Sequence, residues 1–295
     1  MSDFSFSSTA EEVTEGLDLS GKTVLVTGCN SGIGQETARV LGLRGAHVIG
    51  LARTEARARE ALEGAGVAGT PIACELSEPS SVREAAAAVR ALDRPIDALI
   101  CNAGIMALPE RTVKHGLELQ FLTNHLGHFI LVRALEDRLA ADGRVVVVSS
   151  GAHFMAPEVG IELDDLSMAA TYSAWPAYGQ SKLANVLFAR SLARRFEGSA
   201  KVACSLHPGV IRTNLGRNNP GETEAFFTTM DPAKVKSIPQ GAATQCLLAV
   251  NPLGAGASGQ YWSDCQPAKT SASAQDDALA EALWEKSEAL AESLR

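Results

Sequence analysis

Short apolar runs alternate along the chain with longer stretches in which apolar residues recur at helical spacing. Runs that are apolar on both faces predict strands covered on both sides, as in a parallel sheet between two helical layers. The predicted strands are 22–27, 47–52, 71–76, 96–101, 144–149, 202–206 and 259–262. The predicted helices between them are 35–44, 55–62, 80–92 and 113–139.

This alternation predicts an α/β fold with a doubly wound, seven-stranded parallel sheet and right-handed crossovers, a single-domain Rossmann fold. We expect an N-terminal tail at 1–20, the Rossmann domain at 21–265 and a C-terminal segment at 266–295. Residues 214–238 are rich in Gly, Pro, Asn and Thr and predict a substrate loop or lid. An amphipathic helix at 277–294 is expected to pack on the core or on a partner subunit.

Composition excludes several classes of function. The 295 residues carry a net charge of −8, which argues against a nucleic-acid partner. No apolar run is long enough for a membrane span, and the polar N-terminus lacks a secretion signal. Six scattered cysteines favour reduced thiols in the cytoplasm. His125 and His128 lie one turn apart without clustered Cys or carboxylate residues, so no metal site is expected.

A glycine-rich turn follows the first predicted strand. Glycines permit a sharp turn and close backbone approach to a ligand, and the N–H groups of the following helix favour a pyrophosphate. The alternative is a tight strand–helix turn without a ligand, but its position after the first strand favours a dinucleotide. The candidate cofactor residues here are Gly28, Asn30, Ser31, Gly32, Ile33 and Gly34.

Arg53 follows the second predicted strand, where folds that prefer NAD tend to place an acid for the ribose 2′-hydroxyl. Ala52 occupies that place, and an arginine here suits a 2′-phosphate. We therefore expect NADP(H) to be preferred, with NAD(H) still accepted. The alternative is a solvated arginine that opens the stretch Arg53, Arg57 and Arg59.

Tyr178 and Lys182 stand four residues apart in Y-G-Q-S-K, so on a helix they share one face. A phenol is a weak acid, and a fixed cation nearby favours its phenolate form. The pair is therefore suited to moving a proton on or off an alcohol oxygen. For the spacing alone, a surface tyrosine beside a solvated lysine is the commoner case.

Five motifs in order resemble the classical short-chain dehydrogenase/reductases. They are T-G-x-x-x-G-I-G at 27–34, N-A-G at 102–104, S-S at 149–150, Y-x-x-x-K at 178–182 and P-G at 208–209. The runs N-H-L-G-H-F at 124–129 and S-K-L-A-N at 181–185 resemble the retinol-dehydrogenase-like branch, which includes the WW-domain oxidoreductases. The resemblance implies an NAD(P)-dependent oxidoreductase.

The family pattern also implies roles for single residues. Tyr178 would be the general acid or base, Lys182 would lower its pKa, and Ser150 rather than Ser149 would hold the substrate oxygen. Asn124 would anchor a water chain from Lys182. Further cofactor contacts are implied for Glu75, Leu76, Asn102, Ala103, Gly104, Tyr178, Lys182, Pro208, Gly209, Ile211 and Thr213.

Long, apolar loops surround the expected site. They predict a small-molecule substrate whose alcohol or carbonyl group is carried by a bulky hydrophobic framework. The candidate pocket residues are Met106, His153, Phe154, Trp175, Phe226 and Phe227. Trp175 is equally suited to packing against the loop. A non-catalytic NADP-binding regulatory protein stays as the alternative, and an epimerase or dehydratase is disfavoured by the glycine spacing. A homodimer or homotetramer is compatible with the helix 113–139 and the helix that contains Tyr178, which form dimer faces in many members of the family, but a hydrophobic helix face is equally a core face.

Overall fold

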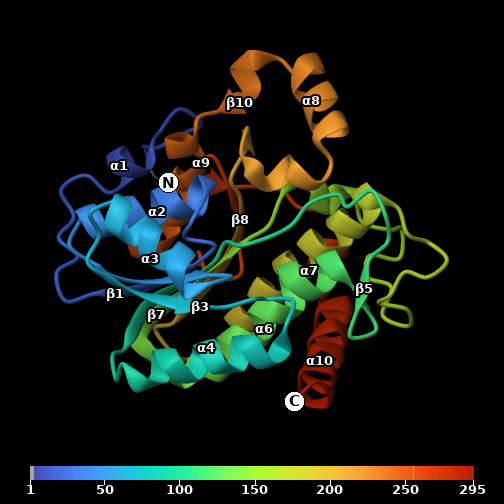
Figure 1. Cartoon of the computed structure of the whole chain (residues 1–295), viewed down its shortest axis with the longest axis horizontal. Coiled ribbons are helices and arrows are strands. Elements are labelled where there is room, and N and C mark those ends of the chain that lie inside the picture. Colours follow the sequence, from blue (N-terminus) through green and yellow to red (C-terminus); the bar gives the residue numbers. More distant parts are fainter. Residues whose placement is uncertain (1–2, 255) are drawn as a thin grey trace.

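The computed structural model, which describes residues 3–254 and 256–295, is a three-layer α/β structure with one large sheet at its centre (Figure 1). Seven strands are parallel, and a short antiparallel strand, β12, extends one edge. The predicted doubly wound Rossmann architecture is confirmed, with β12 as an addition. In spatial order the strands are β12 (Gln266–Pro267), β11 (Tyr261–Ser263), β8 (Val202–His207), β7 (Leu139–Val148), β4 (Ile96–Cys101), β1 (Thr23–Thr27), β2 (His47–Ala52) and β3 (Gly69–Ala73).

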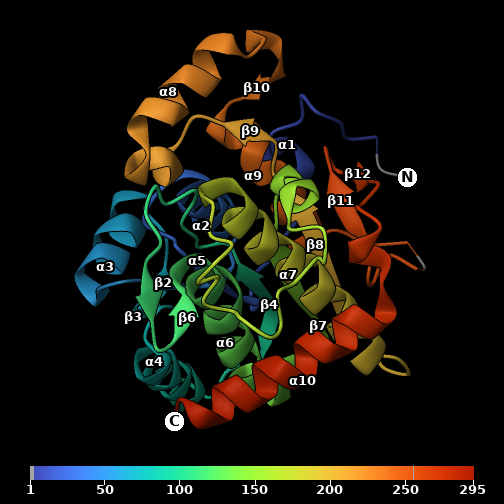
Figure 2. The ribbon, with the colours of Figure 1, turned by 90° about the vertical axis from the view of Figure 1, so that its right-hand side faces the viewer.

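Helices cover both faces of the sheet, and each face buries its own apolar core (Figure 2). One core lies under α4, α6, α7 and α10, and the other under α1, α2, α3 and α9. Because both faces are buried, the strands are apolar on both sides, which is the pattern that predicted them. The helices are α1 (Ala10–Val13), α2 (Gly32–Leu43), α3 (Glu55–Gly64), α4 (Pro79–Ala91), α5 (Leu119–Phe121), α6 (Gly127–Leu135), α7 (Ala174–Arg195), α8 (Pro220–Thr229), α9 (Ile238–Val250) and α10 (Asp277–Ser293).

The strand order reverses beside β1, which pairs with β2 on one side and β4 on the other. The chain therefore crosses to opposite faces of the sheet after these strands, and a crevice opens at their carboxyl ends. Ligands of open α/β sheets bind at this place. The turn after β1 and the segment after β4 are thereby brought together, although they lie about 75 residues apart in the sequence. The Asn102 N–H donates a hydrogen bond to the Thr27 hydroxyl across this gap.

One predicted element is wrong. The expected helix at 113–139 begins instead as a hairpin, β5 (Val113–Lys114) and β6 (Leu117–Glu118), and its last residue already belongs to β7. His115 and Gly116 have φ angles of 51° and 77°, which no helix accommodates. The helical part runs through α5, a π-helical turn η1 (Leu122–Leu126) and α6.

The substrate loop predicted at 214–238 contains more regular structure than expected. It holds a 3-10 turn η4 (Asn214–Asn218), the helix α8 that starts at Pro220, and a further 3-10 turn, Pro232–Lys234. The segment returns to the sheet through a two-stranded pairing of β9 (Val210–Ile211) with β10 (Val235–Lys236). In Figure 1 this segment lies above the carboxyl ends of the strands.

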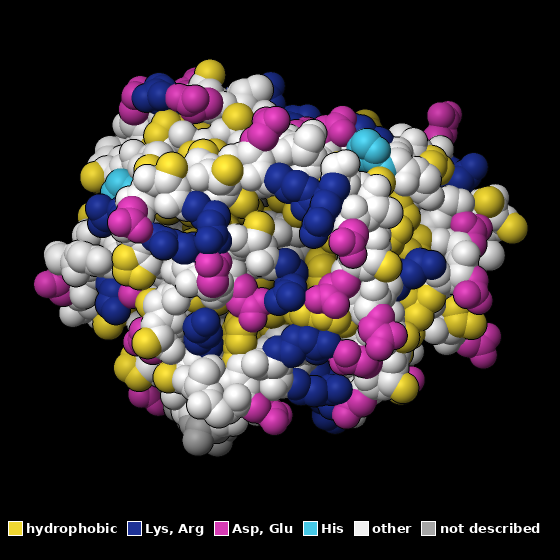
Figure 3. Space-filling view, turned by 90° about the horizontal axis from the view of Figure 1, so that it is seen from below, with side chains coloured by type: hydrophobic (Ala, Val, Ile, Leu, Met, Phe, Trp, Pro, Cys, Tyr) yellow, Lys and Arg dark blue, Asp and Glu magenta, His cyan; other side chains and the backbone are white. Residues whose placement is uncertain are grey.

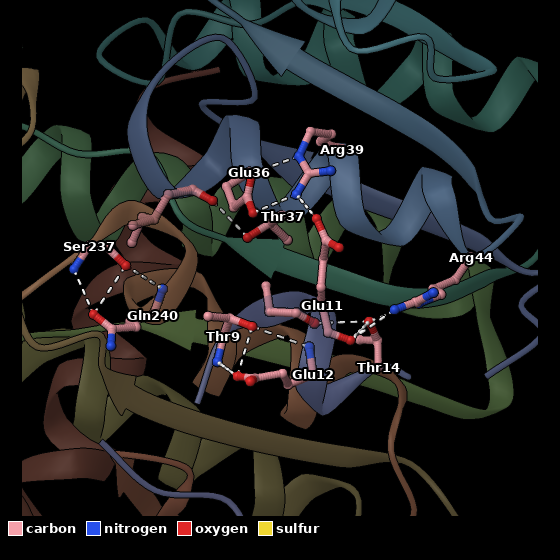
Figure 4. A network of polar contacts seen from close by, with 12 residues as sticks. Thr9, Glu11, Glu12, Thr14, Glu36, Thr37, Arg39, Arg44, Ser237 and Gln240 are labelled. Atoms are coloured by element: carbon pink, nitrogen blue, oxygen red, sulfur yellow. Dashed lines mark hydrogen bonds and ion pairs between the residues drawn. The ribbon is translucent and has the colours of Figure 1, made fainter. Parts of the chain in front are cut away.

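The described part of the N-terminal segment packs against α2 and α9 (Figure 4). Thr9 caps α1 in a capping box with Glu12, and Ala10 and Val13 are buried. Glu11 reaches Arg39 on α2 at 2.5 Å, and its carbonyl accepts a hydrogen bond from Arg44 at 2.8 Å. Residues 1–2 of the expected tail lie outside the described residues.

The face that carries α4, α6 and α10 mixes charges of both signs (Figure 3). Arg90 pairs with Asp137 at 2.6 Å, and Arg133 pairs with Glu288 at 3.3 Å. Like charges therefore do not accumulate on this side, as a nucleic-acid surface would require. Among the described residues, no helix is both long and apolar enough to cross a membrane.

Replacing Leu99 by alanine should cost about 2–5 kcal/mol in the free energy of unfolding, because a cavity is left at the centre of the sheet. Leu99 is fully buried in β4. The matched control is Leu43→Ala on α2, where a side chain that is 56% exposed should cost less than about 0.5 kcal/mol. Urea denaturation of both variants measures the difference, and equal costs would contradict the packing described.

Candidate active site

A cavity of about 990 Å³ lies at the carboxyl ends of the parallel strands, beside the point where the strand order reverses. It runs from the turn after β1 and the end of β2, past the amino-terminal half of α7, to the segment that holds α8. Every predicted cofactor residue lines this cavity. They are Gly28, Asn30, Ser31, Gly32, Ile33, Gly34, Arg53, Glu75, Leu76, Asn102, Ala103, Gly104, Tyr178, Lys182, Pro208, Gly209, Ile211 and Thr213.

The glycine turn is shaped by close backbone approach. A Cβ at Gly34 would lie 2.3 Å from the Gly28 carbonyl oxygen and 2.3 Å from Asn102 Nδ2, so no other residue fits there. Gly28 itself has φ of 69°, a conformation that favours glycine. Asn102 Nδ2 donates to the Thr27 carbonyl at 2.8 Å and closes the turn from the neighbouring strand.

The start of α2 is suited to an anion. Its N-cap residue, Ser31, makes no side-chain hydrogen bond to the first turn, so the amino-terminal N–H groups are left for a ligand. Gly32, the first residue of the helix, has φ of 54° and lies beside Thr213 from the opposite wall of the cavity. This arrangement fits the pyrophosphate of a dinucleotide.

Tyr178 and Lys182 lie on the face of α7 that is turned to the cavity, as their spacing predicts. Both are almost fully buried, with 3% and 4% exposure. The Lys182 ammonium lies 5.6 Å from the centroid of the Tyr178 ring and donates to the Val148 carbonyl at 3.1 Å. Trp175 packs edge-on against the Tyr178 ring at 6.2 Å between centroids.

The two serines after β7 have different surroundings. Ser149 is buried and donates to the Lys182 carbonyl at 2.7 Å, which anchors α7 to the sheet. Ser150 and Tyr178 both line the cavity, and the Ser150 hydroxyl acts to lower the pKa of the Tyr178 phenol. Ser150 therefore stands where a substrate oxygen beside Tyr178 would be reached.

Asn124 lies in the π-helical turn η1 and is fully buried, behind the cavity rather than on its surface. Its side chain accepts from the Ile105 N–H at 2.9 Å and donates to the Ile105 carbonyl at 2.9 Å. It also donates to Ser181 Oγ at 2.9 Å, and Ser181 donates in turn to the Tyr178 carbonyl at 2.7 Å. Asn124 thereby joins the segment after β4 to the helix that carries Tyr178.

His128 continues this network to the glycine turn. Its Nδ1 lies 2.9 Å from the Asn124 carbonyl, which can only accept, so Nδ1 carries the proton. Its Nε2 then accepts from Thr27 Oγ1 at 2.9 Å. Burial lowers the pKa of His128 to about 4, so the ring is neutral. The role of His128 is therefore structural, and no metal-holding group of three or more His, Cys, Asp or Glu occurs among the described residues.

Burial sets the protonation states at the centre of the site. It raises the pKa of Tyr178 to about 12, and the hydrogen bond from Ser150 acts in the opposite direction. Burial lowers the pKa of Lys182 to about 8. The expected lowering of the phenol pKa by Lys182 is absent from this geometry, because the ammonium faces the ring and the Val148 carbonyl.

The cavity ends in three arginines beside β2. Arg53 and Arg57 line it from the start of α3, and Arg217 lines it from η4 on the opposite wall. Burial lowers the pKa of Arg217, and the charges of Arg53 and Arg57 add to this shift. Within residues 3–254 and 256–295, Arg53 and Arg57 make no side-chain hydrogen bond or ion pair, unlike Arg90 and Arg133.

The other end of the cavity is apolar. Four predicted pocket residues, Met106, Trp175, Phe226 and Phe227, line it. The other two do not: His153 is buried with its ring nitrogens on Ser150 O and Ser271 N, and Phe154 is 57% exposed.

The helix α8 closes the apolar end and is held by polar contacts at its edges. Trp175 Nε1 donates to Glu222 at 3.1 Å, and Asn219 donates to the Ala107 carbonyl at 3.5 Å. Arg212 pairs with Glu224 at 2.6 Å and lies 4.5 Å from the Phe227 ring centroid. This segment therefore has few ties to the sheet, as expected of a substrate loop.

The cavity also contains residues that were not predicted as site residues, among them Arg57, His207 and Arg217. Arg57 had a signal, because it belongs to the arginine stretch that Arg53 opens. His207 was interpreted as a strand-end residue, yet its Nδ1 accepts from the Gly151 N–H at 3.1 Å. Its position at the carboxyl end of a parallel strand was the available signal. Arg217 had none, because its place depends on the path of the loop.

The burial of Lys182 should appear in the pH dependence of stability. An unfolded lysine has a pKa of 10.5, so below about pH 8 the folded state bears the full penalty of a buried charge. Between about pH 8 and 10.5 the folded state loses this proton first, and the penalty fades. Lys182→Met should therefore raise the free energy of unfolding, relative to wild type, more at about pH 7 than at about pH 10.

Lys22→Met is the control, because Asp97 raises the pKa of Lys22 and the effect of this substitution should be constant over that range. Urea denaturation at the two pH values measures both differences. A gain for Lys182→Met that grew toward pH 10 would contradict the burial of a charged Lys182.

The chain is similar to known proteins over most of its length. A family model for short chain dehydrogenase matches residues 22–162. The chain is 41% identical to short-chain dehydrogenase TIC 32 B, chloroplastic, of Brassica napus, over 99% of this chain and 96% of that protein. It is 39% identical to human retinol dehydrogenase 14 (92% and 86% covered) and 40% identical to human WW domain-containing oxidoreductase (96% and 71%). The resemblance to that branch is confirmed.

Solved structures give the same assignment. An uncharacterized protein from Mycobacterium paratuberculosis is 34% identical, with a TM-score of 0.77, over 95% of this chain and 97% of that one. Angucycline C-6 ketoreductase LanV with bound NADP is 25% identical, with a TM-score of 0.65, over 80% and 91%. With the ordered motifs assembled around one cavity, these matches establish that the chain belongs to the short-chain dehydrogenase/reductase family of oxidoreductases.

Proposed function

We propose that the protein interconverts a secondary alcohol and a carbonyl on a bulky hydrophobic substrate, with NADP(H) as the preferred cofactor and Tyr178 as general acid and base. One observation carries the proposal. Tyr178 and Ser150 both line the cavity between the glycine turn and the apolar end, and the Ser150 hydroxyl acts to lower the pKa of the Tyr178 phenol. A substrate oxygen bound there would contact both groups, with the reacting carbon turned toward the cofactor side.

The residues of the turn fit a dinucleotide. The close approach at Gly34 and the uncapped start of α2 form a cradle for a pyrophosphate, and Pro208, Gly209 and Thr213 line the cavity beyond it, where a nicotinamide would lie. Bound NADP(H) would supply the hydride chemistry. Lys182 faces this part of the cavity and is the residue placed to hold the nicotinamide ribose.

In the reducing direction Tyr178 donates its proton to the carbonyl oxygen, and in the oxidising direction its phenolate accepts the alcohol proton. A pKa of about 12 keeps the phenol protonated at neutral pH in the cofactor-free site, which suits the acid role. Ser150 donates a hydrogen bond to the same oxygen as charge develops on it. Lys182, and Asn124 behind it, are the proposed route by which Tyr178 exchanges its proton with solvent.

The preference for NADP(H) over NAD(H) rests on Arg53 together with Arg57 and Arg217. Three guanidinium groups line one end of the cavity, and those of Arg53 and Arg57 have no carboxylate partner among the described residues. A phosphate would bring the negative charge that this end lacks. The bound NADP of the related LanV structure agrees with this choice.

The substrate class follows from the apolar end of the cavity. Met106 and Trp175 present thioether and aromatic surface, and α8 adds Phe226 and Phe227 to the same lining. Such surface favours a bulky hydrophobic framework over a sugar or an acid. The name of the relative retinol dehydrogenase 14 points to an apolar alcohol as well.

A reducing cytoplasm is the proposed location, because Cys29, Cys74, Cys101, Cys204 and Cys246 are reduced and buried. A homodimer or homotetramer stays a prediction. The face of α6 and α7 that was considered for it is covered by α10, which places Trp284 5.0 Å from the Phe129 ring and stacks it under Arg195 at 3.7 Å. An assembly would therefore use another surface.

Tyr178→Phe should lower kcat at least about 100-fold, because the proton donor is lost while the ring remains. The Kd for NADPH should stay within about twofold of wild type, since the phenol acts on the substrate oxygen. NADPH oxidation with a panel of hydrophobic carbonyls and fluorescence titration measure the two effects. Tyr172→Phe is the control, because Tyr172 does not line the cavity; its phenol donates to the Leu108 carbonyl, and the variant should retain turnover.

Wild-type kcat in Tyr178→Phe would contradict the mechanism. Intact NADPH binding by wild type without turnover across the panel would favour the alternative, a non-catalytic NADP-binding regulatory protein.

Arg53→Ala should raise the Kd for NADPH about tenfold or more and leave that for NADH nearly unchanged, because a charge-assisted bond to the 2′-phosphate is lost. Arg59→Ala is the matched control: Arg59 is 52% exposed and pairs with Glu55 one helical turn away, outside the cavity lining. Titration of both cofactors into each variant decides the matter. An unchanged ratio of the two Kd values in Arg53→Ala would remove the argument for NADP preference.

A further inference from the structure

A buried lysine lies directly behind the loop that follows β8. Lys236, on β10, has a side chain that is 1% exposed. Its neighbour is Gly209, which has φ of 97° and whose Cβ would lie 2.6 Å from Lys236 Cδ. The backbone at Gly209 therefore rests on the methylene groups of Lys236, and its opposite side lines the cavity.

The ammonium of Lys236 has a carboxylate partner from another part of the sheet. Its Nζ lies 2.6 Å from Asp264 Oδ1, in the turn between β11 and β12. Asp264 has φ of 54°, and its side chain is 42% exposed. The ion pair therefore connects β10, and through it the β9 strand that follows Gly209, to the edge of the main sheet.

The N-terminal segment covers this ion pair. The Phe6 ring centroid lies 4.9 Å from Lys236 Nζ, a cation–π contact. The segment is held in place from two sides, by Gln266 Nε2 on the Phe4 carbonyl at 2.8 Å and by Gln240 Nε2 on the Ser7 carbonyl at 3.2 Å. Residues at the start of the chain thereby reach the back of the cavity wall.

An apolar side chain would fill this space at lower cost, because burying an ammonium requires compensation by a partner. The charge is nevertheless directed to a fixed point on the sheet edge, and the stem of the side chain packs against a loop whose positive φ at Gly209 requires glycine. The charges of this pair also act on His207, which lines the cavity. Burial is the main cause that lowers the pKa of His207 to about 4. The charge of Asp264 opposes this shift, and the charge of Lys236 adds to it.

We propose that Lys236 is a positioning residue for the nicotinamide end of the cofactor, held by Asp264 and covered by Phe6. The proposal rests on the function proposed above. Because Gly209 lies between Lys236 and the cavity, Lys236 acts through this loop and touches no reacting atom. The described N-terminal segment is accordingly part of the support of the active site, rather than an accessory tail.

The test compares two ligands that share the adenosine end. NADPH occupies the whole cleft, whereas 2′,5′-ADP carries the adenosine and both phosphates but no nicotinamide. Lys236→Met keeps the methylene volume and removes the charge, so it should raise the Kd for NADPH about fivefold and leave that for 2′,5′-ADP within about twofold. Fluorescence titration and displacement measure the two constants.

Lys22→Met is the matched control, because Lys22 also pairs with an aspartate, Asp97 at 2.9 Å, but lies outside the cavity lining. Both ligands should bind it as they bind wild type. Two milder variants are Phe6→Ala, at a residue that is 37% exposed, and Asp264→Asn. Each removes one contact of the Lys236 ammonium, so each should raise the Kd for NADPH and leave that for 2′,5′-ADP unchanged. If Lys236→Met fails to fold, the ratio of the Kd values for NADPH and 2′,5′-ADP in these two variants tests the proposal instead.

Two results would overturn the proposal while leaving the proposed function standing: unchanged constants in all three variants, or equal losses of both ligands, which a general loosening of the structure would cause. Wild-type protein that bound neither NADPH nor 2′,5′-ADP would overturn the proposed function, and this inference with it.

Discussion

The rest of the site depends on the hydrogen bonds of the Thr27 hydroxyl, which connect three segments of the chain. It accepts hydrogen bonds from the Asn102 N–H at 2.9 Å and the Ala103 N–H at 3.0 Å, and it donates to His128 Nε2 at 2.9 Å. One buried group thereby uses its donor and both acceptor sites on three partners. It fixes the end of β1 to the segment after β4, where the strand order reverses and the crevice opens.

From Thr27 the polar chain continues through His128, Asn124 and Ser181 to the backbone of Tyr178. Each member has a defined donor and acceptor, so the chain has one arrangement rather than several. Its members are buried, where an unmade hydrogen bond is expensive. The glycine turn that would hold a pyrophosphate and the phenol that would move a proton are thus built on one rigid frame, as preorganised catalysis requires.

Much of this could be predicted from sequence, because the signals were local. The strands β2 and β4 have the predicted bounds, since strands buried on both faces are continuous apolar runs. The Tyr178–Lys182 pair lies on one helical face because four residues make about one turn. The glycine turn was recognisable because Gly34 meets backbone atoms that no side chain could approach and Gly28 has a positive φ that favours glycine.

What could not be predicted depends on contacts between distant segments. The turn at His115 and Gly116 interrupts a pattern that was otherwise helical, and the π-helical turn around Asn124 depends on His128 meeting Thr27, about a hundred residues away. His153 was expected in the pocket as an aromatic loop residue, but its ring nitrogens meet Ser150 O and Ser271 N. No local pattern in the sequence encodes such pairings.

The two ends of the cavity are built on different physical principles. The polar end relies on buried hydrogen bonds and on backbone approach, in which single substitutions are costly. The apolar end is lined by Phe226 and Phe227 on a segment held at its edges by contacts such as Trp175 with Glu222. Side chains of this segment can change without disturbing the chain from Thr27 to Tyr178. Substrate choice can therefore vary while the proton-transfer geometry is kept, which is why the fold and the site are better determined than the substrate.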